Sequence, residues 1–398
     1  MVRVASLLLS SSGEGVGMLE RSVARIATAF GTRADLLVLP DQVVVTGAHT
    51  GPSPRVAVVK ATPGLSRLDQ VMDLHVLVED VEAGLSVAQT VSRLDAIESE
   101  PPRWPRWLRV VGVMLFTVGF APSVVGTAGE IVATVLLGAL MGILMVTFEG
   151  RRLEVLLPFV GAFVLTLVAA LVLPGLVTAS GVVLVVVPAL FVVVPGDYLS
   201  AAAGELIAGR ISAGASRLLY AALVLALLVI GIAAAAEVTG NDRLLTETPV
   251  SPTLPFAVVT LAWIPFAVGL VLAFNAHLSA LPWLVPTVIG TYLVQQAATK
   301  LVGDITGTLI AGIALGVFAG LASRPPGRPP RLVLILGGFF VLTVGGLGLR
   351  GATALIGTDI VSGFEDLRDF FIQMPTVAIA LALSVLATDR PGRLPRRS

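Results

Sequence analysis

The chain has 398 residues, of which 56% are hydrophobic and only 13% are charged. A soluble globular protein needs about 25% charged residues, so much of this surface must face lipid. The 26 basic residues balance 26 acidic ones, which excludes a typical nucleic-acid-binding domain, because such domains carry a basic excess. Cysteine is absent and the three histidines are widely spaced. The sequence therefore predicts no disulfide, no metal site and no cofactor.

Residues 1–105 have ordinary polarity and predict a small α+β domain. The apolar stretch at the start is too short for a signal peptide. Apolar residues recur at helical spacing from Ser12 to Phe30, which predicts a helix. Short β-rich runs bounded by Pro, Asp and Gly predict strands at 36–40, 42–46 and 56–60. Two further helices are predicted at 65–82 and 86–99. Because the domain has neither a nucleophile elbow nor metal-ligand spacing, we expect a regulatory or gating domain rather than an enzyme.

From Trp107 onward, apolar stretches long enough to span a bilayer recur. We predict ten spans, at 107–125, 128–148, 153–173, 176–195, 216–238, 254–275, 281–301, 305–322, 331–350 and 370–388. The amphipathic segments 199–215 and 353–369 predict helices on the membrane surface. The predicted parts are therefore an α+β domain at 1–105, a first five-helix half at 106–240, and a second half at 241–398 that ends in a short basic tail.

The distribution of arginine and lysine predicts the orientation of these spans. If the N-terminal domain is cytoplasmic, the inner side carries 14 basic residues in or next to the membrane region and the outer side carries four. Cytoplasmic loops of membrane proteins carry such an excess. We therefore expect a multi-pass protein of the plasma (inner) membrane with both termini in the cytoplasm.

The sequence also contains an internal repeat. A shift of 149 residues places 191–214 on 340–363 without a gap, and eight of the 24 positions are identical, including Phe191/Phe340 and Gly196/Gly345. Five predicted spans separate the two copies, so the copies have opposite orientations. Two inverted five-helix halves are a common architecture of secondary transporters. Chance similarity between two apolar stretches is the alternative interpretation.

Several motifs resemble those of the threonine/serine exporter family. The first motif is the stretch from Pro188 to Pro195-Gly196, followed by Glu205, Gly209, Gly214 and Arg217. The second lies in the N-terminal region and consists of Ser11-Ser12-Gly13-Glu14-Gly15, Glu20-Arg21 and Ala29-Phe30-Gly31. The third is the connection Arg328–Arg331. The chain departs from the family pattern at Ala201, where members tend to have a polar residue, and at Val344-Gly345, where the second Pro-Gly would fall. The resemblance implies a plasma-membrane exporter of small hydroxy amino acids that is driven by the proton gradient.

Other function classes remain as alternatives to a secondary transporter. No Walker A pattern is present, so ATP does not drive the chain through a site of that kind. A channel or a non-transporting membrane scaffold or regulatory protein is the runner-up. A membrane enzyme is disfavoured because nucleophile, base and metal ligands are not clustered. The expected partners are the small-molecule substrate, protons and the lipid bilayer, with homo-oligomerisation left open.

A polar stripe in the seventh span is the first part of the predicted substrate site. Thr287, Thr291, Gln295 and Thr299 are spaced four apart, so they follow one face of a helix. Their hydroxyls and amide can bind a zwitterion. The alternative is that they hold neighbouring helices together.

The end of the fourth span is the second part of the predicted site. Pro195 and Gly196 predict a broken helix, followed directly by Asp197. Broken helices mark substrate sites in inverted repeats, although a plain kink explains the same residues. For proton coupling we select Glu205, which matches the acidic position of the family, and Glu130, which lies inside the second span.

The remaining charged residues and the glycines of the eighth span predict structural roles. Glu149 and Glu154 are expected to pair with Arg151 and Arg152, and Asp304 with Lys300. The glycines Gly312, Gly316 and Gly320 predict close helix packing.

Overall fold

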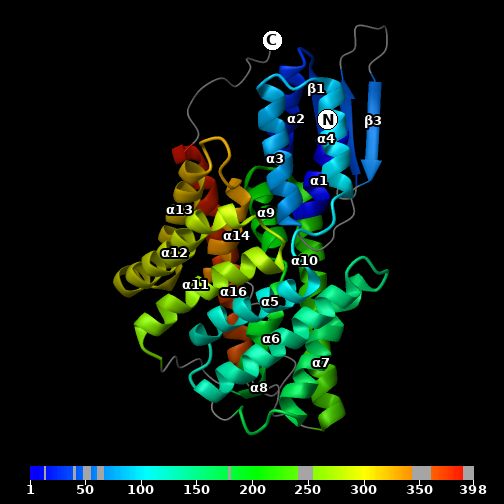
Figure 1. Cartoon of the computed structure of the whole chain (residues 1–398). Coiled ribbons are helices and arrows are strands. Elements are labelled where there is room, and N and C mark those ends of the chain that lie inside the picture. Colours follow the sequence, from blue (N-terminus) through cyan, green and yellow to red (C-terminus); the bar gives the residue numbers. More distant parts are fainter. Residues whose placement is uncertain are drawn as a thin grey trace.

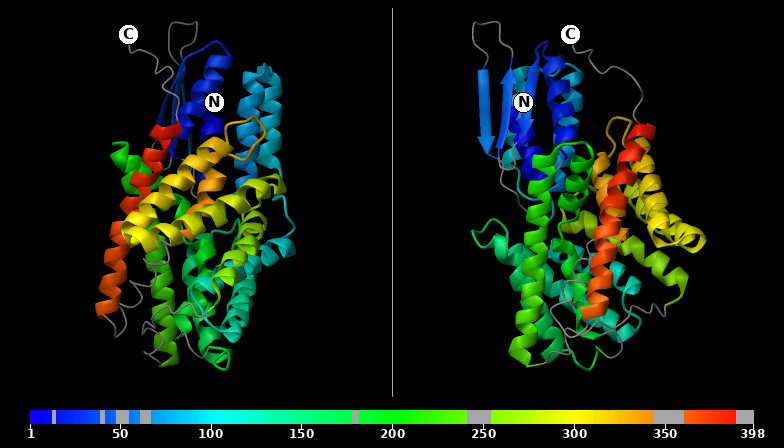
Figure 2. Two further views of the ribbon diagram at one scale, coloured as in Figure 1. Left: turned by 90° about the vertical axis from the view of Figure 1, so that its left-hand side faces the viewer. Right: turned by 180° about the vertical axis from the view of Figure 1, so that it is seen from behind.

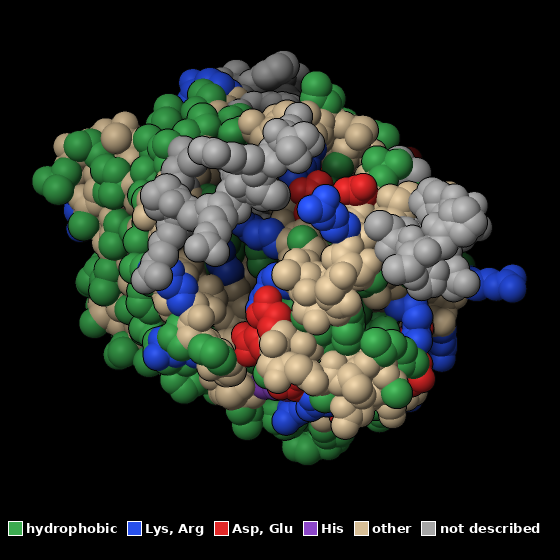
Figure 3. Space-filling model, turned by 90° about the horizontal axis from the view of Figure 1, so that it is seen from above, with side chains coloured by type: hydrophobic (Ala, Val, Ile, Leu, Met, Phe, Trp, Pro, Cys, Tyr) green, Lys and Arg blue, Asp and Glu red, His purple; other side chains and the backbone are tan. Residues whose placement is uncertain are grey.

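The computed structural model places an N-terminal domain on one end of a bundle of long helices (Figure 1). The structure describes residues 1–12, 15–38, 42–47, 55–60, 67–177, 181–240, 254–342 and 360–388. Acidic and basic side chains gather around the N-terminal domain when the molecule is seen from that end, and hydrophobic side chains cover the flank beside it (Figure 3). This distribution of charged and hydrophobic side chains indicates that the N-terminal end is solvated and that the flank of the body faces lipid.

The N-terminal domain is a three-stranded antiparallel sheet covered on one face by helices. Its elements are α1 (Val2–Ser12), α2 (Val16–Ala29), β1 (Ala34–Val38), β2 (Gln42–Gly47), β3 (Arg55–Lys60), α3 (Leu68–Glu82) and α4 (Val87–Ser99). The strand order is β1-β2-β3, and the three predicted strands are confirmed. Helices α1 and α2 pack on the sheet, and α3 and α4 lie behind them. The core includes Leu8, Leu19, Val43 and Leu74, which are fully buried.

One helix of this domain has no counterpart among the predicted elements. Residues 2–12 form a helix of their own. Val4, Ala5 and Leu8 are buried on one face of α1 because their spacing is helical. The short apolar start of the chain is therefore part of the core of the domain.

The body of the molecule consists of helices in two successive groups. The first group contains α5 (Arg106–Phe120), α6 (Ala128–Phe148), α7 (Leu157–Leu171), α8 (Gly181–Leu190), α9 (Gly196–Ile207) and α10 (Ile211–Thr239). The second contains α11 (Phe256–Ala273), α12 (Leu281–Val302), α13 (Asp304–Ala322), α14 (Arg331–Val341) and α16 (Ile360–Thr388). Short 3-10 turns join some of them: η1 (Ala121–Ser123), η2 (Glu154–Leu156), η3 (Phe191–Val193) and η5 (Leu278–Ala280).

Within the described residues, six helices are long and apolar enough to cross a membrane. They are Ala128–Phe148, Glu154–Leu171, Ile211–Thr239, Phe256–Ala273, Leu278–Val302 and Asp304–Ala322. Three shorter apolar helices, Gly181–Val193, Arg331–Val341 and Ile372–Val385, coincide with further predicted spans. The chain is therefore a multi-pass membrane protein. The count of ten spans stays a prediction, and 343–350 of the ninth span lies outside the described residues.

The two predicted surface helices are not separate elements where the structure describes them. Segment 199–215 is interrupted at Gly209, which has a φ of 76°, a conformation that glycine adopts readily. Helix α9 ends before this point, and the residues from Ile211 onward continue as α10. Likewise, residues 360–369 are the first turns of α16, while 353–359 lie outside the described residues. A helix of 29 residues is about 43 Å long, which exceeds the roughly 30 Å hydrocarbon core.

The two helix groups repeat one another in order and in packing. Helices α11, α14 and α16 begin 150, 150 and 149 residues after α5, α8 and α10. Helix α7 packs on α10 and α13 packs on α16; α6 packs on α8 and α12 packs on α14. The starts of these three helix pairs are therefore separated by the 149 residues of the sequence repeat or by one residue more.

Helices α5 and α11 cross closely at the centre of the body through a pair of reciprocal contacts. A Cβ on Gly119 would lie 2.4 Å from the backbone nitrogen of Phe266, and a Cβ on Gly269 would lie 2.1 Å from that of Phe116. Gly119 and Phe116 precede Gly269 and Phe266 by the same 150 residues. The two contacts are thus reciprocal: Gly119 meets the backbone of Phe266, and Gly269 meets the backbone of Phe116.

Glycines also bring α13 and α16 into close contact, as predicted. Cβ atoms on Gly312, Gly316 and Gly320 would meet the side chains of Ala380, Ser384 and Thr388 at 3.0 Å or less. The face of small residues therefore serves helix packing.

Candidate functional site

The predicted break in the fourth span is present in the structure. Helix α8 contains Pro188 and ends at Leu190, and the 3-10 turn η3 follows it. Pro195, with φ −78° and ψ 62°, then separates this turn from α9. Gly196 begins α9 and faces α14, since a Cβ there would lie 3.1 Å from the Phe339 ring. The side chain of Asp197 lies outside the described residues, and its backbone is in the first turn of α9.

The polar stripe lies along α12, with its hydroxyls mostly directed to its own helix. Thr287 and Thr291 are buried, and their hydroxyls donate to the carbonyl oxygens of Trp283 at 2.5 Å and of Thr287 at 2.7 Å. Thr299 packs against α13, because a Cβ on Gly307 would lie 2.5 Å from its hydroxyl oxygen. Gln295 is half-buried. The hydroxyl protons of Thr287 and Thr291 are thus used within the helix, while their oxygens can still accept a hydrogen bond.

Helix α14 connects the two parts of the predicted site. It packs on α12 and on α9. A Cβ on Gly337 would lie 2.5 Å from Leu284 of α12, one turn from Thr287, whereas Phe339 faces Gly196 at the start of α9. The break and the stripe therefore share α14 as a neighbour.

A chain of aromatic rings also links the break to the stripe. Phe191 in η3 stacks on Phe120 at a centroid distance of 4.4 Å, Phe120 lies 6.0 Å from Trp263, and Trp263 lies 5.7 Å from Tyr292. Tyr292 follows Thr291 on α12. Sequence analysis did not select Trp263; the available signal was a tryptophan in the middle of a span, since membrane tryptophans concentrate at the interfaces.

Glu205 occupies a buried site at the junction of α9 and α10. Its Oε1 accepts the backbone N–H of Val16 at 2.9 Å. Its Oε2 lies 3.2 Å from Arg217 Nε, and the two side chains are only 4% and 8% exposed. Burial raises the pKa of Glu205 above its ordinary value, against the opposing effects of Arg217, the Val16 amide and Arg210. The carboxylate thus joins α10 to the first residue of α2 in the N-terminal domain.

The N-terminal domain also contacts loops of the second helix group. The Leu68 N–H donates to the Phe274 carbonyl at 3.1 Å, and the Gly327 N–H donates to Glu79 at 3.2 Å. Arg210 pairs with Glu20 beside the Glu205 site. The domain therefore bridges both helix groups at one end of the body (Figure 2).

Glu130 has a structural role at the start of α6. It is fully buried and completes a capping box with Thr127, in which each side chain accepts the other residue's backbone N–H at 3.3 Å. Such boxes satisfy two of the free amides at a helix start. Any proton-coupling role of Glu130 would be in addition to this one.

The structure gives Glu149, Glu154 and Lys300 contacts other than the predicted charge pairs. Glu149 pairs with the buried Arg109 at 2.6 Å rather than with its sequence neighbours, and Glu154 accepts the Gly150 N–H at 2.7 Å. Lys300 lies over the Phe256 ring. Gly303, with a φ of 85°, ends α12 before Asp304 begins α13, so Lys300 and Asp304 are not on one helix.

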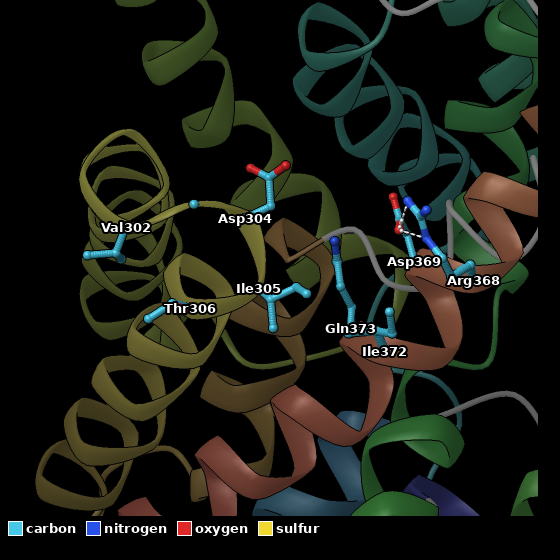
Figure 4. A pocket seen from close by; sticks show the side chains of 9 residues that line it. Val302, Asp304, Ile305, Thr306, Arg368, Asp369, Ile372 and Gln373 are labelled. Atoms are coloured by element: carbon cyan, nitrogen blue, oxygen red, sulfur yellow. Dashed lines mark hydrogen bonds and ion pairs between the residues drawn. The ribbon is translucent and has the colours of Figure 1, made fainter.

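A pocket of about 400 Å³ lies beyond the end of the polar stripe, between the α12–α13 turn and α16. Asp304 lies on one side of it and the Arg368–Asp369 ion pair on the other (Figure 4). Of the charged residues that line the pocket, Asp304 and Arg368 are exposed and Asp369 is half-buried. The described residues contain no cluster of metal-ligating side chains, so the geometry offers polar and charged groups but no metal centre.

Comparison with known families decides the identity of the chain. Residues 1–239 match the family described as "Putative threonine/serine exporter". The chain belongs to the threonine/serine exporter family. The match ends at Thr239, the last residue of α10, so it contains the N-terminal domain and the first helix group of this family member. No curated protein and no solved structure matches the chain.

Proposed function

We propose that this member of the threonine/serine exporter family is a secondary transporter that exports threonine, serine or similar small hydroxy amino acids by proton antiport. The observation that carries the proposal is the family match over the N-terminal domain and the first helix group. The membrane helices and the broken helix between α8 and α9 support it, because such breaks bind substrates in transporters. We expect no enzymatic activity.

The proposed architecture is two inverted five-helix halves, and alternating access would come from movement of one half against the other. The similar offsets of three helix starts, 149 or 150 residues, and the reciprocal contacts of Gly119 and Gly269 support an internal two-fold relation. We further propose that the protein lies in the plasma membrane with both termini in the cytoplasm. The hydrogen bonds of Gly327 to Glu79 and of Arg324 to Thr388 support this, since they place the end of α16 near the N-terminal domain.

The proposed substrate site lies between the break and the stripe. Thr287, Thr291, Gln295 and Thr299 would bind the zwitterion from α12, and Pro195, Gly196 and Asp197 would bind it from the break. A zwitterion carries no net charge, so hydroxyls, amides and free backbone groups can bind it without a fixed ion pair. The shared neighbour α14 would have to shift for both parts to reach one substrate, which fits a site that assembles during alternating access.

Glu205 is the proposed proton-coupling residue, with Glu130 as the second candidate. A coupling carboxylate must be protonated in one state of the transport cycle and ionised in the other. Glu205 is buried, and its charged form is held by Arg217 and the Val16 amide. Protonation would weaken both contacts and loosen the N-terminal domain from the α9–α10 junction. Proton loading would thereby be coupled to movement at the cytoplasmic end.

Counterflow in proteoliposomes tests the proposed function. Vesicles preloaded with unlabelled threonine should accumulate labelled threonine, serine should compete, and an imposed pH gradient should drive uptake against the threonine gradient. Uptake that only follows the threonine gradient would favour a channel. Vesicles without any specific uptake would favour a scaffold or regulatory protein.

A further inference from the structure

The indole N–H of Trp263 is buried without a hydrogen-bond acceptor. Trp263 is 1% exposed, and in the described part of the chain its Nε1 makes no hydrogen bond. Buried donors in proteins are nearly always paired, because an unpaired one loses its bonds to water without replacement. We therefore ask which function an unpaired N–H could have at this position.

Packing alone does not explain a tryptophan at this position. The rings around it belong to Phe120, Phe266 and Tyr292, at centroid distances of 6.0, 5.0 and 5.7 Å. Phenylalanine fills the neighbouring positions and would bury apolar surface here without an unpaired N–H. The indole thus supplies a donor that the packing does not need.

The position of Trp263 points to the substrate site. It lies on α11 between Phe120, which stacks on Phe191 in the break, and Tyr292, which adjoins the stripe on α12. Pro265 lies two residues further along α11. A proline inside a helix removes the hydrogen bond to the carbonyl four residues earlier and allows a bend. Helix α11 can therefore bend next to Trp263, and such a bend would change the direction of the indole N–H.

We propose that the Trp263 indole N–H donates a hydrogen bond to the carboxylate of the transported amino acid. This inference rests on the proposed function and adds a binding residue to the same site. A carboxylate is the strongest acceptor that an amino acid offers, because its charge strengthens the hydrogen bond. The Thr and Gln side chains of the stripe would then bind the rest of the substrate.

Trp263→Phe tests the proposal in the full-length protein in proteoliposomes. It removes the N–H and keeps an aromatic ring. We expect the apparent affinity for threonine to fall by about ten- to a hundredfold, the range for a lost hydrogen bond to a charged group. The amino alcohol of threonine, which has no carboxylate, should compete equally weakly with wild type and variant. Trp107→Phe is the matched control, because Trp107 is 67% exposed at the start of α5.

A second measurement leaves Trp263 in place. In a protein whose Trp104, Trp107 and Trp283 are replaced by Phe, Trp263 is the only indole, and threonine should shift its fluorescence emission. The proposal is overturned if Trp263→Phe has the threonine affinity of the wild type. It is also overturned if threonine does not change the fluorescence emission of Trp263. If instead the wild-type protein neither binds nor transports threonine, the proposed function is wrong and the inference falls with it.

Discussion

The carboxylate of Glu205 caps the helix that begins at Val16, across 189 residues of sequence. The first amides of a helix have no partner within it, and Gly15, the residue before α2, has no side chain to provide one. Glu205 accepts the Val16 N–H at 2.9 Å while Arg217 lies against its other oxygen. The same acidic group thus stabilises a helix of the N-terminal domain and the α9–α10 junction of the membrane region.

Glu205→Ala should destabilise the protein by about 3–5 kcal/mol, because removal of one partner leaves a buried charge without its carboxylate. Thermal unfolding in detergent measures the change. Glu98→Ala is the control: Glu98 pairs with Arg3, but both side chains are at least 39% exposed, and such pairs contribute about 1 kcal/mol or less. Equal losses in the two variants would contradict the structural importance of the Glu205 site.

Glu205→Gln should abolish pH-driven transport and leave threonine exchange intact. The amide oxygen still accepts the Val16 N–H, but the residue no longer binds a proton, and exchange needs no net proton movement. Because burial raises the pKa of Glu205, the folded protein binds this proton at a higher pH than a free glutamate does, and the proton is lost as pH rises through that value. Uptake rates over a pH series, in wild type and variant, measure the effect. If Glu205→Gln and Glu130→Gln both retain full pH-driven uptake, neither residue couples the proton.

The sequence predicted those features that depend on local patterns. The three strands, the break at Pro195 and the packing face of Gly312, Gly316 and Gly320 each follow from residue types at fixed spacing. The capping of Val16 by Glu205 depends on how two distant parts of the chain dock. No local pattern contains that information, although the acidic residue itself could be selected.

Two other features were missed for a different physical reason. The end of α9 depends on the positive φ of Gly209, and a glycine in an amphipathic stretch is also compatible with a continuous helix. The unpaired donor of Trp263 becomes visible only when the surrounding rings are placed. The sequence shows which groups can donate a hydrogen bond, and the tertiary structure shows which of them lack a partner.

Gly119→Ala and Gly269→Ala should each destabilise the protein by about 1–3 kcal/mol. The added methyl group collides with backbone atoms that cannot move aside. Similar losses are expected because the two glycines make counterpart contacts. The control is Gly290→Ala in α12, where a Cβ meets nothing within 4 Å. Thermal unfolding of the three variants is the measurement. A large loss in only one of the two glycine variants would count against a two-fold relation between α5 and α11.

A cysteine at Asn241, just after α10, should react with membrane-impermeant maleimide only from the outside of intact cells. The residue itself lies outside the described residues, and the prediction follows from the distribution of arginine and lysine. The native chain has no cysteine, so the label reports only the introduced one. A cysteine at Glu98 in the N-terminal domain is the control and should react only after the membrane is made permeable. The reverse pattern would invalidate the proposed orientation.

Gln295→Ala should weaken threonine binding and preserve proton coupling. Gln295 is half-buried on the stripe of α12, and its amide can both donate and accept, whereas the hydroxyl protons of Thr287 and Thr291 are used within the helix. A lost hydrogen bond to a charged substrate group lowers affinity by about ten- to a hundredfold. The concentration dependence of counterflow measures the affinity, and the ratio of pH-driven to exchange uptake measures the coupling. Thr260→Ala is the control, because its exposed hydroxyl on α11 donates to the Phe256 carbonyl of the same helix. If Gln295→Ala has wild-type affinity, the stripe holds helices together and the substrate binds elsewhere.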